Sequence, residues 1–169
     1  MGKSLTERIA EARQLHDKCG VALASDREIA DIVTRYRAAI RETNELMVQQ
    51  GVAKACSECA SKAAGSCCFH GMEEDYDAIH LLINLLLGCK LETSTGRDGD
   101  CVFNSDRGCT LAAKCCFCLN FFCPQLIELL GPAGMETMRG AVRKETSTTW
   151  ELDRAIRQWL ASHLSAGRR

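Results

Sequence analysis

Cysteine is the residue whose number and spacing most clearly offer chemistry in this sequence. The chain of 169 residues holds 12 cysteines, and a first group lies in CSECASKAAGSCC, from Cys56 to Cys68. Cys56 and Cys59 form a CxxC pair, a spacing at which two thiolates can grip a metal ion or a cluster iron from a tight turn. The adjacent Cys67 and Cys68 point in different directions in a helix or an extended chain, so they suit two neighbouring sites better than one ion. This stretch therefore predicts ligands for more than one metal centre.

A second group of cysteines lies in CVFNSDRGCTLAAKCCFCLNFFC, residues 101–123. If its last ten residues form a helix, Cys116 and Cys123 share one face because they are seven residues apart. Cys115 and Cys118, three residues apart, share another face. The second group thus also offers thiols in two directions, independently of the first.

The rest of the sequence favours metal binding over disulfide bonds. The N-terminal MGKSLTERIAEARQLHDK is charged and lacks the apolar segment of a secretory signal. The most apolar stretch, Ile79 to Leu87, is far shorter than the roughly 20 residues that span a membrane. We therefore expect a cytoplasmic protein with reduced thiols and no membrane contact, and cysteines at this density then indicate metal ligands.

Composition excludes one class of partner and favours helices. The 21 Lys and Arg residues nearly balance the 22 Asp and Glu residues, so no basic excess indicates a nucleic-acid partner. The chain contains only 2 prolines, which favours long uninterrupted helices.

Capping signals and apolar periodicity predict the helices that must position the cysteines. Ser4–Glu7 and Ser25–Glu28 both read as capping boxes, and each precedes apolar residues at helical spacing. We expect the first helix to end at Gly20, the second to run to about Gln50, and a third to lie between Gly71 and Gly88, its C-cap. We further expect a short helix from about residue 111 that carries CCFCLNFFC toward Pro124 and continues over residues 125–130 after a kink. A last helix should open at about residues 132–134 and run to residue 164.

No convincing alternation of apolar and polar residues predicts a strand. The fold class expected is all-α: a four-helix-type bundle with an inserted cysteine-rich metal-binding region. We expect residues 1–169 to form a single domain, with residues 56–123 as the metal-binding region within it.

Three segments, CSECASKAAGSCC, CVFNSDRGCTL and CLNFFC, resemble the zinc- or iron-chelating cysteine-cluster family, also called the CxxCxxCC domain. The resemblance covers residues 56–123 and implies a metal or iron–sulfur site, not a particular reaction. This chain departs from the family pattern in two places. Seven residues separate Cys59 from Cys67 where the family has two, and Lys114 and Cys115 stand where the family has Arg-Pro. By resemblance, the family's cysteine positions are Cys56, Cys59, Cys67, Cys68, Cys101, Cys109 and Cys118, with Cys123 a frequent addition.

These arguments rank the candidate ligands. Cys19 and Cys89 are expected to be small apolar residues, and His70 and His80 to be solvated or satisfied in the core. No residue is assigned a catalytic role, and whether the protein is an enzyme is left open. The expected cofactor and metal ligands are Cys56, Cys59, Cys67, Cys68, Cys101, Cys109, Cys118 and Cys123, with Cys115 and Cys116 next in rank.

The leading functional hypothesis is a protein with one or two iron–sulfur clusters of the 4Fe–4S type. It would serve electron transfer or cluster-dependent redox chemistry with a protein redox partner. Phenylalanines near the cysteines favour this reading because they could shield a cluster from water; they are Phe69, Phe103, Phe117, Phe121 and Phe122.

Two alternatives stay open. A zinc protein with Cys₄ sites would use the metal to hold loops together for protein–protein interaction, and cysteine spacing alone does not separate zinc from iron–sulfur. A copper(I)-storage bundle would need cysteines on several long helices facing one interior. The long first, second and last helices contribute only Cys19, which counts against copper.

Overall fold

A computed structural model of the chain describes residues 2–60, 67–93, 99–105 and 108–164. The all-α prediction is confirmed, because helices dominate these residues and the strands among them are two residues long. None of the helices in these ranges is long and apolar enough to cross a membrane. The elements are α1 (Leu5–Ser25), α2 (Arg27–Gln49), α3 (Val52–Ala60), the 3₁₀ helix η1 (Met72–Asp75), α4 (Ala78–Leu86), β1 (Asn104–Ser105), β2 (Gly108–Cys109), α5 (Cys116–Asn120) and α6 (Pro124–Leu164).

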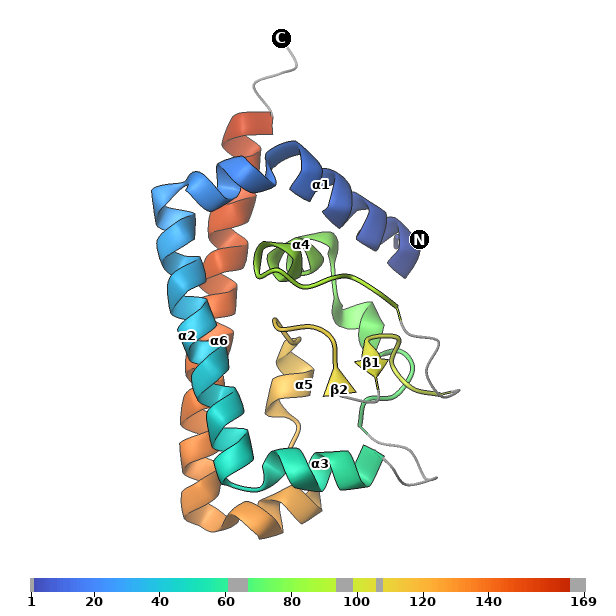
Figure 1. Ribbon diagram of the computed structural model, residues 1–169, viewed down its shortest axis with the longest axis vertical. Coiled ribbons are helices and arrows are strands. Elements are labelled where there is room, and N and C mark those ends of the chain that lie inside the picture. Colours follow the sequence, from blue (N-terminus) through green and yellow to red (C-terminus); the bar gives the residue numbers. More distant parts are fainter. Residues whose placement is uncertain (1, 61–66, 94–98, 106–107, 165–169) are drawn as a thin grey trace.

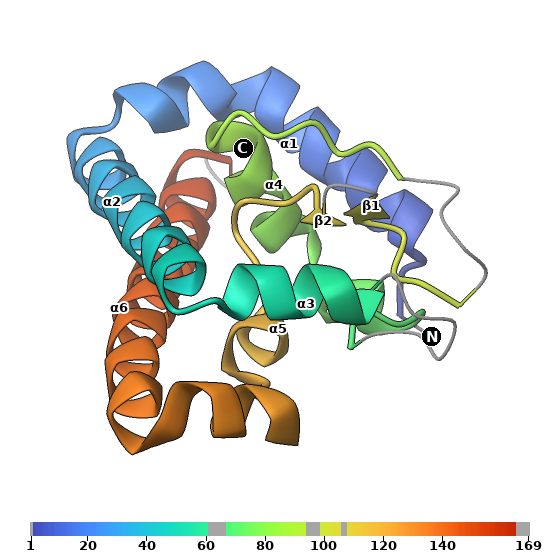
Figure 2. The same ribbon diagram turned by 60° about the horizontal axis from the view of Figure 1, so that its bottom comes forward.

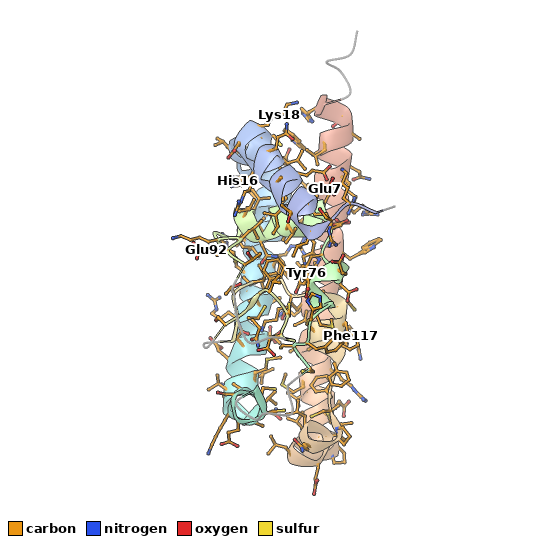
Figure 3. The ribbon with its side chains drawn as sticks, turned by 90° about the vertical axis from the view of Figure 1, so that its right-hand side faces the viewer. Glu7, His16, Lys18, Tyr76, Glu92 and Phe117 are labelled. Atoms are coloured by element: carbon orange, nitrogen blue, oxygen red, sulfur yellow. The ribbon has the colours of Figure 1, made fainter. Side chains whose placement is uncertain are left out.

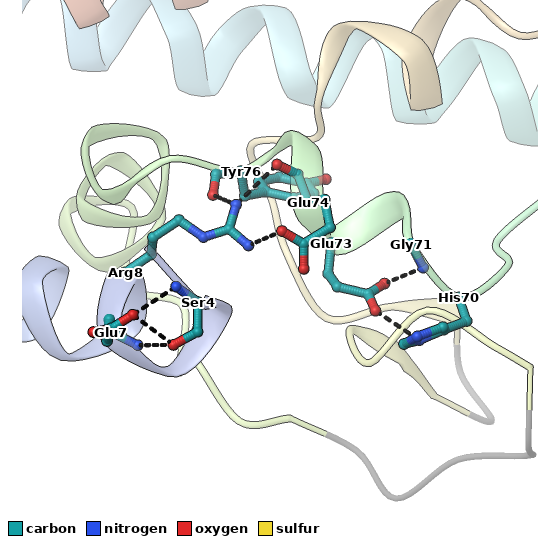
Figure 4. Close-up of polar contacts among 8 residues, drawn as sticks. All are labelled: Ser4, Glu7, Arg8, His70, Gly71, Glu73, Glu74 and Tyr76. Carbon is teal, nitrogen blue, oxygen red and sulfur yellow. Dashed lines mark hydrogen bonds and ion pairs between the residues drawn. The ribbon is translucent and has the colours of Figure 1, made fainter. Parts of the chain in front are cut away.

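Helix α1 begins at the predicted capping box. The Ser4 hydroxyl accepts a hydrogen bond from the Glu7 amide at 3.3 Å, and the Glu7 carboxylate accepts one from the Ser4 amide at 2.7 Å (Figure 4). The predicted end at Gly20 is wrong, because α1 continues to Ser25. Gly20 is buried, and a Cβ there would lie 3.0 Å from the His16 ring, so glycine is the residue that fits at this position.

The junction between α1 and α2 lies one residue later than predicted. Asp26, not Ser25, caps α2, and its carboxylate accepts a hydrogen bond from the Ile29 amide at 3.1 Å. Helix α2 then runs to Gln49 and is followed by Gly51, whose φ of 76° lies in the left-handed region that favours glycine.

Four helices surround the main core, as the bundle prediction required. Helices α2 and α6 run antiparallel side by side (Figure 1). Helix α1 packs on α4, and α4 also contacts α6. The largest fully buried side chains lie on these four helices and on the segments next to α4; they include Leu23, Tyr36, Tyr76, Leu81, Phe103, Met138 and Ile156. Helix α5, the β1–β2 hairpin and η1 lie on the side of the α2–α6 pair that α4 occupies (Figure 1).

Helix α6 contains the predicted break. Gly131 has φ 60° and ψ −178°, so the chain turns there and a second helical segment starts at Pro132 (Figure 2). A proline lacks the amide that a helix interior needs, but it is well suited to a first turn. The break sends residues 124–130 across the end of the α2–α6 pair.

The cysteine-rich region contains a helix that the sequence argument missed. Cys56 and Cys59 lie in α3, not in a tight turn. The helix expected from about residue 111 to Cys123 exists only as Cys116–Asn120. Its C-cap, Phe121, is extended, with φ −81° and ψ 107°.

Candidate functional site

The cysteines of the first group are presented by α3 and by the segment before η1. Cys56 and Cys59 are three residues apart in α3 and therefore share one face of that helix. Helix α3 packs against α2 and α6. Cys123 immediately precedes α6, and its charge is among the causes that raise the pKa of Cys56. Tertiary packing thus brings the first and last cysteines of the region together.

Backbone pairing joins the two cysteine groups. The Cys101 amide donates a hydrogen bond to the Cys68 carbonyl oxygen at 2.8 Å, and the His70 amide donates to the Gly99 carbonyl oxygen at 2.7 Å. Between them, Phe69 and Asp100 form an isolated antiparallel bridge. Cys68 and Cys101 consequently lie side by side on paired extended segments.

The β1–β2 hairpin holds Cys101 and Cys109. Asn104 pairs with Cys109 across the hairpin, and the Asn104 amide donates to the Cys101 carbonyl oxygen at 2.8 Å. Cys101 is buried, and burial raises its pKa to about 12, with the charges of Glu73 and Cys109 acting in the same direction. The Cys109 residue has exposed surface, yet atoms packed around its thiol raise its pKa by desolvation.

Helix α5 begins at a second CxxC pair. Cys115 is the N-cap of α5, and its sulfur accepts a hydrogen bond from the Cys118 amide at 3.5 Å. The two sulfurs lie 3.3 Å apart. The pKa of Cys115 is lowered to about 7, chiefly by its hydrogen bond with the Cys118 side chain, and the pKa of Cys118 is raised by the same contact. An amide hydrogen bond at a helix start favours the thiolate, so Cys115 is the more acidic of the two thiols.

Side chains from η1 and its C-cap hold Cys115 in place. The Cys115 amide donates a hydrogen bond to the Tyr76 hydroxyl at 3.0 Å, and the Asp75 carboxylate lies 3.8 Å from the Cys115 sulfur. Tyr76 is 1% exposed and lies in the middle of the molecule (Figure 3). Its ring meets Phe103 edge to face, with the ring centroids 5.5 Å apart. The sequence argument placed Tyr76 in the core and missed this contact with a cysteine, because no local signal predicts it.

Helix α4 clamps the segment that leads into α5. Asn84 is fully buried; its side-chain amide donates to the Ala113 carbonyl oxygen at 3.0 Å, and its side-chain oxygen accepts from the Ala113 amide at 2.9 Å. The Nε2 atom of His80 lies 3.2 Å from the same carbonyl oxygen, and burial lowers the His80 pKa. The Ala113 carbonyl oxygen thus gives the buried His80 ring a hydrogen-bond partner, as expected for a histidine in the core.

Nine thiols form a continuous group in which neighbours shift one another's pKa. Besides burial, the charges of Cys123, Cys68 and Cys59 raise the pKa of Cys56. A hydrogen bond with Cys68 raises the pKa of Cys67, and the charge of Cys68 also acts on Cys109 and Cys118. We call these residues the cysteine group: Cys56, Cys59, Cys67, Cys68, Cys101, Cys109, Cys115, Cys118 and Cys123.

Lys114 supplies positive charge to the cysteine group. Its charge lowers the pKa of Cys56 and of Cys109, and opposes the desolvation that raises both. The same charge lowers the pKa of Glu145, a carboxyl group buried between α2 and α6. The sequence argument noted Lys114 only as a departure from the family pattern and did not predict this position between two groups of thiols.

Cys116 lies apart from the cysteine group. It is exposed, and its sulfur accepts a hydrogen bond from the Asn120 side-chain amide at 3.3 Å. The prediction that Cys116 and Cys123 share a helix face is wrong, because α5 ends at Asn120. Cys115 and Cys118 were predicted to share a helix face. Cys115 is instead the N-cap of α5, and from there its sulfur lies 3.3 Å from that of Cys118.

The remaining candidate residues have ordinary structural roles. Cys19 is buried in the core, where its thiol donates to the Leu15 carbonyl oxygen at 3.0 Å. The Cys89 sulfur accepts from the Ala112 amide at 3.4 Å. His70 is exposed and its Nδ1 atom lies 2.8 Å from the buried Glu73 carboxylate (Figure 4).

The aromatic shield predicted around the cysteines is incomplete. Phe103 is fully buried, but Phe69, Phe117 and Phe121 are 48%, 43% and 42% exposed. Phe117 and Phe121 stack on each other with ring centroids 5.3 Å apart. Phe122 is half-buried, so four of the five phenylalanines face solvent at least in part.

Among the described residues, no three or more His, Cys, Asp or Glu side chains are arranged so that they could hold a metal ion as they stand. Comparisons with family models, with curated proteins and with solved structures find no match for this chain. The fold and site define an all-α protein with a concentrated group of cysteines. Its resemblance to the cysteine-cluster family rests on cysteine spacing and stays a proposal.

Proposed function

We propose that the cysteine group binds a metal centre, and that the protein is a cysteine-ligated metalloprotein of the iron–sulfur class. The observation that carries the proposal is the continuity of the group: Cys68 interacts with thiols of both the α3 side and the α5 side. One structural zinc or one iron–sulfur cube takes about four thiolates. Nine connected thiols exceed one such site, and they suit one or two clusters of the 4Fe–4S type.

The chemistry of the donor set supports a soft metal. Thiolates select zinc, copper(I) and iron–sulfur clusters over harder ions. The thiols of the group raise one another's pKa, so full ionisation of the group is opposed by repulsion between like charges. A bound cation would remove that opposition, and metal binding would release protons.

An iron–sulfur cluster in this position would supply a one-electron carrier, and we assign the protein to electron transfer or cluster-dependent redox chemistry with a protein partner. Cysteines that ligate a metal must stay reduced, which fits a reducing, cytoplasmic location. The exposed Phe117–Phe121 stack beside α5 supports a partner surface next to the thiols. The relation to the zinc- or iron-chelating cysteine-cluster family is part of the same proposal.

Zinc is the second candidate, and the Cys115–Cys118 pair favours it. Two thiolates on one tetrahedral zinc, each about 2.3 Å from the metal, lie about 3.8 Å apart. The observed separation of 3.3 Å is close to that value. In an iron–sulfur cube each iron takes its own thiolate, which places the protein sulfurs further apart.

Anaerobic purification from iron-supplemented cells, followed by quantification of iron, acid-labile sulfide and zinc, tests the proposal. Iron and sulfide in equal amounts, with visible charge-transfer absorption, are expected for the leading function. Stoichiometric zinc without sulfide would replace it with the second candidate, and a chain free of iron, sulfide and zinc would overturn both. Cys59→Ser should lower the metal content, whereas the matched control Cys19→Ser, in the α1 core, should keep it.

A further inference from the structure

The Cys115–Cys118 pair has the geometry of a dithiol that can close into a disulfide. Its sulfurs lie 3.3 Å apart, and a disulfide bond measures about 2.05 Å, so the sulfurs need to approach by only about 1 Å. Both residues lie where α5 starts, and the Cys115 backbone is held by the Tyr76 hydroxyl. Closing the bond therefore requires side-chain rotation rather than movement of a loop.

The two thiols differ in access, which gives them different roles. Cys115 is 3% exposed, while Cys118 is half-buried. A small molecule can therefore reach Cys118 first, and Cys115 is positioned behind it. The Asp75 carboxylate lies 3.8 Å from the Cys115 sulfur.

We propose that Cys115 and Cys118 form a reversible dithiol–disulfide couple that exchanges electrons with low-molecular-weight disulfides of the glutathione type. The inference goes beyond the proposed metal function, because the couple operates in the metal-free protein. Only its consequence for the cysteine group, the loss of two thiols on oxidation, rests on the proposed function.

The exchange balances as two successive thiol–disulfide steps. The Cys118 sulfur attacks one sulfur of glutathione disulfide, whose bond breaks, and the first glutathione leaves with the proton that Cys118 gives up. The Cys115 sulfur then attacks the Cys118 sulfur of this mixed disulfide, and the second glutathione leaves with the proton of Cys115. The two protein thiols lose two electrons and two protons, and glutathione disulfide gains both.

Peptide mapping of the metal-free full-length chain tests the proposal. After chelation, the reduced protein is equilibrated in buffers of increasing glutathione disulfide, quenched in acid, alkylated and digested with trypsin. Cleavage after Lys114 and Arg139 releases residues 115–139. In the double variant Cys116→Ser, Cys123→Ser, this peptide carries only Cys115 and Cys118 as thiols.

The expected product is the peptide 115–139 at a mass two hydrogens below its reduced form, without alkyl groups and with one reversible midpoint. Adding Cys118→Ser to the double variant should leave Cys115 alkylated, and adding Cys115→Ser should trap glutathione on Cys118. The wild-type chain, sequenced by tandem mass spectrometry, should give the same Cys115–Cys118 linkage, so a folding defect of the variants cannot decide the result.

Two outcomes overturn the inference. One is that Cys115 and Cys118 are both still alkylated in the most oxidising buffer, although glutathione on Cys116 of the wild-type chain shows that the oxidant has reacted. The other is a disulfide from Cys118 to a cysteine outside residues 115–139. Neither outcome bears on the metal proposal, which the separate measurement of iron, sulfide and zinc decides.

Discussion

The amide of Cys101 donates a hydrogen bond to the carbonyl oxygen of Cys68 over 2.8 Å, and this bond ties the two cysteine-rich stretches to each other. Each residue is part of a separate sequence motif, yet their backbones form one paired unit. A ligand held by thiols of one stretch will therefore order the other. The cysteine group should respond to metal as a unit.

Hydrogen exchange should reveal that response. We expect the bound metal to slow amide exchange at Cys68 and through residues 101–123 by at least tenfold, because ligand bonds oppose local opening. Exchange in α1 and α2 should change little, since α1 packs mainly on α4 and α2 mainly on α6. Mass spectrometry of apo and loaded protein measures both. Cooperative loss of all helix on metal removal, seen by circular dichroism, would contradict this expectation.

Arg8 should be a main source of stability on the α1 side of the site. Its guanidinium is buried, donates to the carbonyl oxygens of Glu74 and Tyr76 at 2.8 Å each, and pairs with the Glu74 carboxylate (Figure 4). Arg8→Ala leaves these carbonyls without that donor and should lower the free energy of unfolding by about 2–3 kcal/mol. Urea titration measures the change.

A surface arginine provides the control for Arg8. The Arg35 side chain is 49% exposed and pairs with Asp31 and Glu151, so Arg35→Ala should cost about 1 kcal/mol or less. Equal losses for the two substitutions would show that the α1 contact is no stronger than a surface ion pair.

Asn84 should contribute more to the unfolding free energy than is usual for a neutral side chain. Asn84→Ala removes both hydrogen bonds to Ala113 and leaves the polar groups of that residue buried. We expect a loss of about 2–3 kcal/mol in unfolding free energy, together with a lower metal content, because Ala113 leads into α5. The exposed Asn120→Ala is the control, and it should change stability by about 0.5 kcal/mol or less. An unchanged unfolding free energy for Asn84→Ala would show that these two hydrogen bonds do not stabilise the segment that leads into α5.

Glu145 should make stability fall as pH rises. Burial raises its pKa above the ordinary 4.5, against the opposing effects of the Thr43 hydroxyl and the Lys114 charge. The folded state therefore holds the proton more tightly than the unfolded state, and this contribution is lost as pH rises from about 4.5 through the folded pKa. Glu145→Gln should be more stable than wild type at neutral pH and no more stable at pH 4.5.

Urea titrations across pH measure the Glu145 effect, with Glu42→Gln as the control. Glu42 is a partly exposed partner of Lys144, so its substitution should give a small, nearly pH-independent change. A stabilisation by Glu145→Gln that grows toward acid pH would reverse the predicted sign.

Local signals in the sequence predicted much of the helical frame. The Ser4–Glu7 capping box needs only residues three positions apart, and the break before Pro132 follows from the missing proline amide. The apolar stripes of α2 and α4 likewise predicted buried faces, with Tyr36 and Ile83 among the buried residues. Such features survive in any tertiary context because they depend on neighbouring residues.

Other helix boundaries depended on packing. Gly20 costs a helix about 0.5–1 kcal/mol relative to alanine, yet α1 continues through it because Cys19 and Leu23 are buried against the core. The apolar pattern of residues 52–60 is too short to predict helix α3. This helix forms where it packs on α2 and α6. In both places burial outweighed a weak local preference.

The sequence by itself determined which residues of the candidate site carry thiols and that their spacing suits metal. Only the tertiary structure decided which thiols meet. Cys56 lies near Cys123, and Cys68 beside Cys101, because helix packing and backbone pairing join segments far apart in the chain. Because α5 ends at Asn120, Cys116 does not share a helix face with Cys123, and its exposed sulfur instead accepts a hydrogen bond from Asn120. Spacing fixes direction only within one regular element, and here the thiols belong to several elements whose relative placement is set by the buried contacts between them.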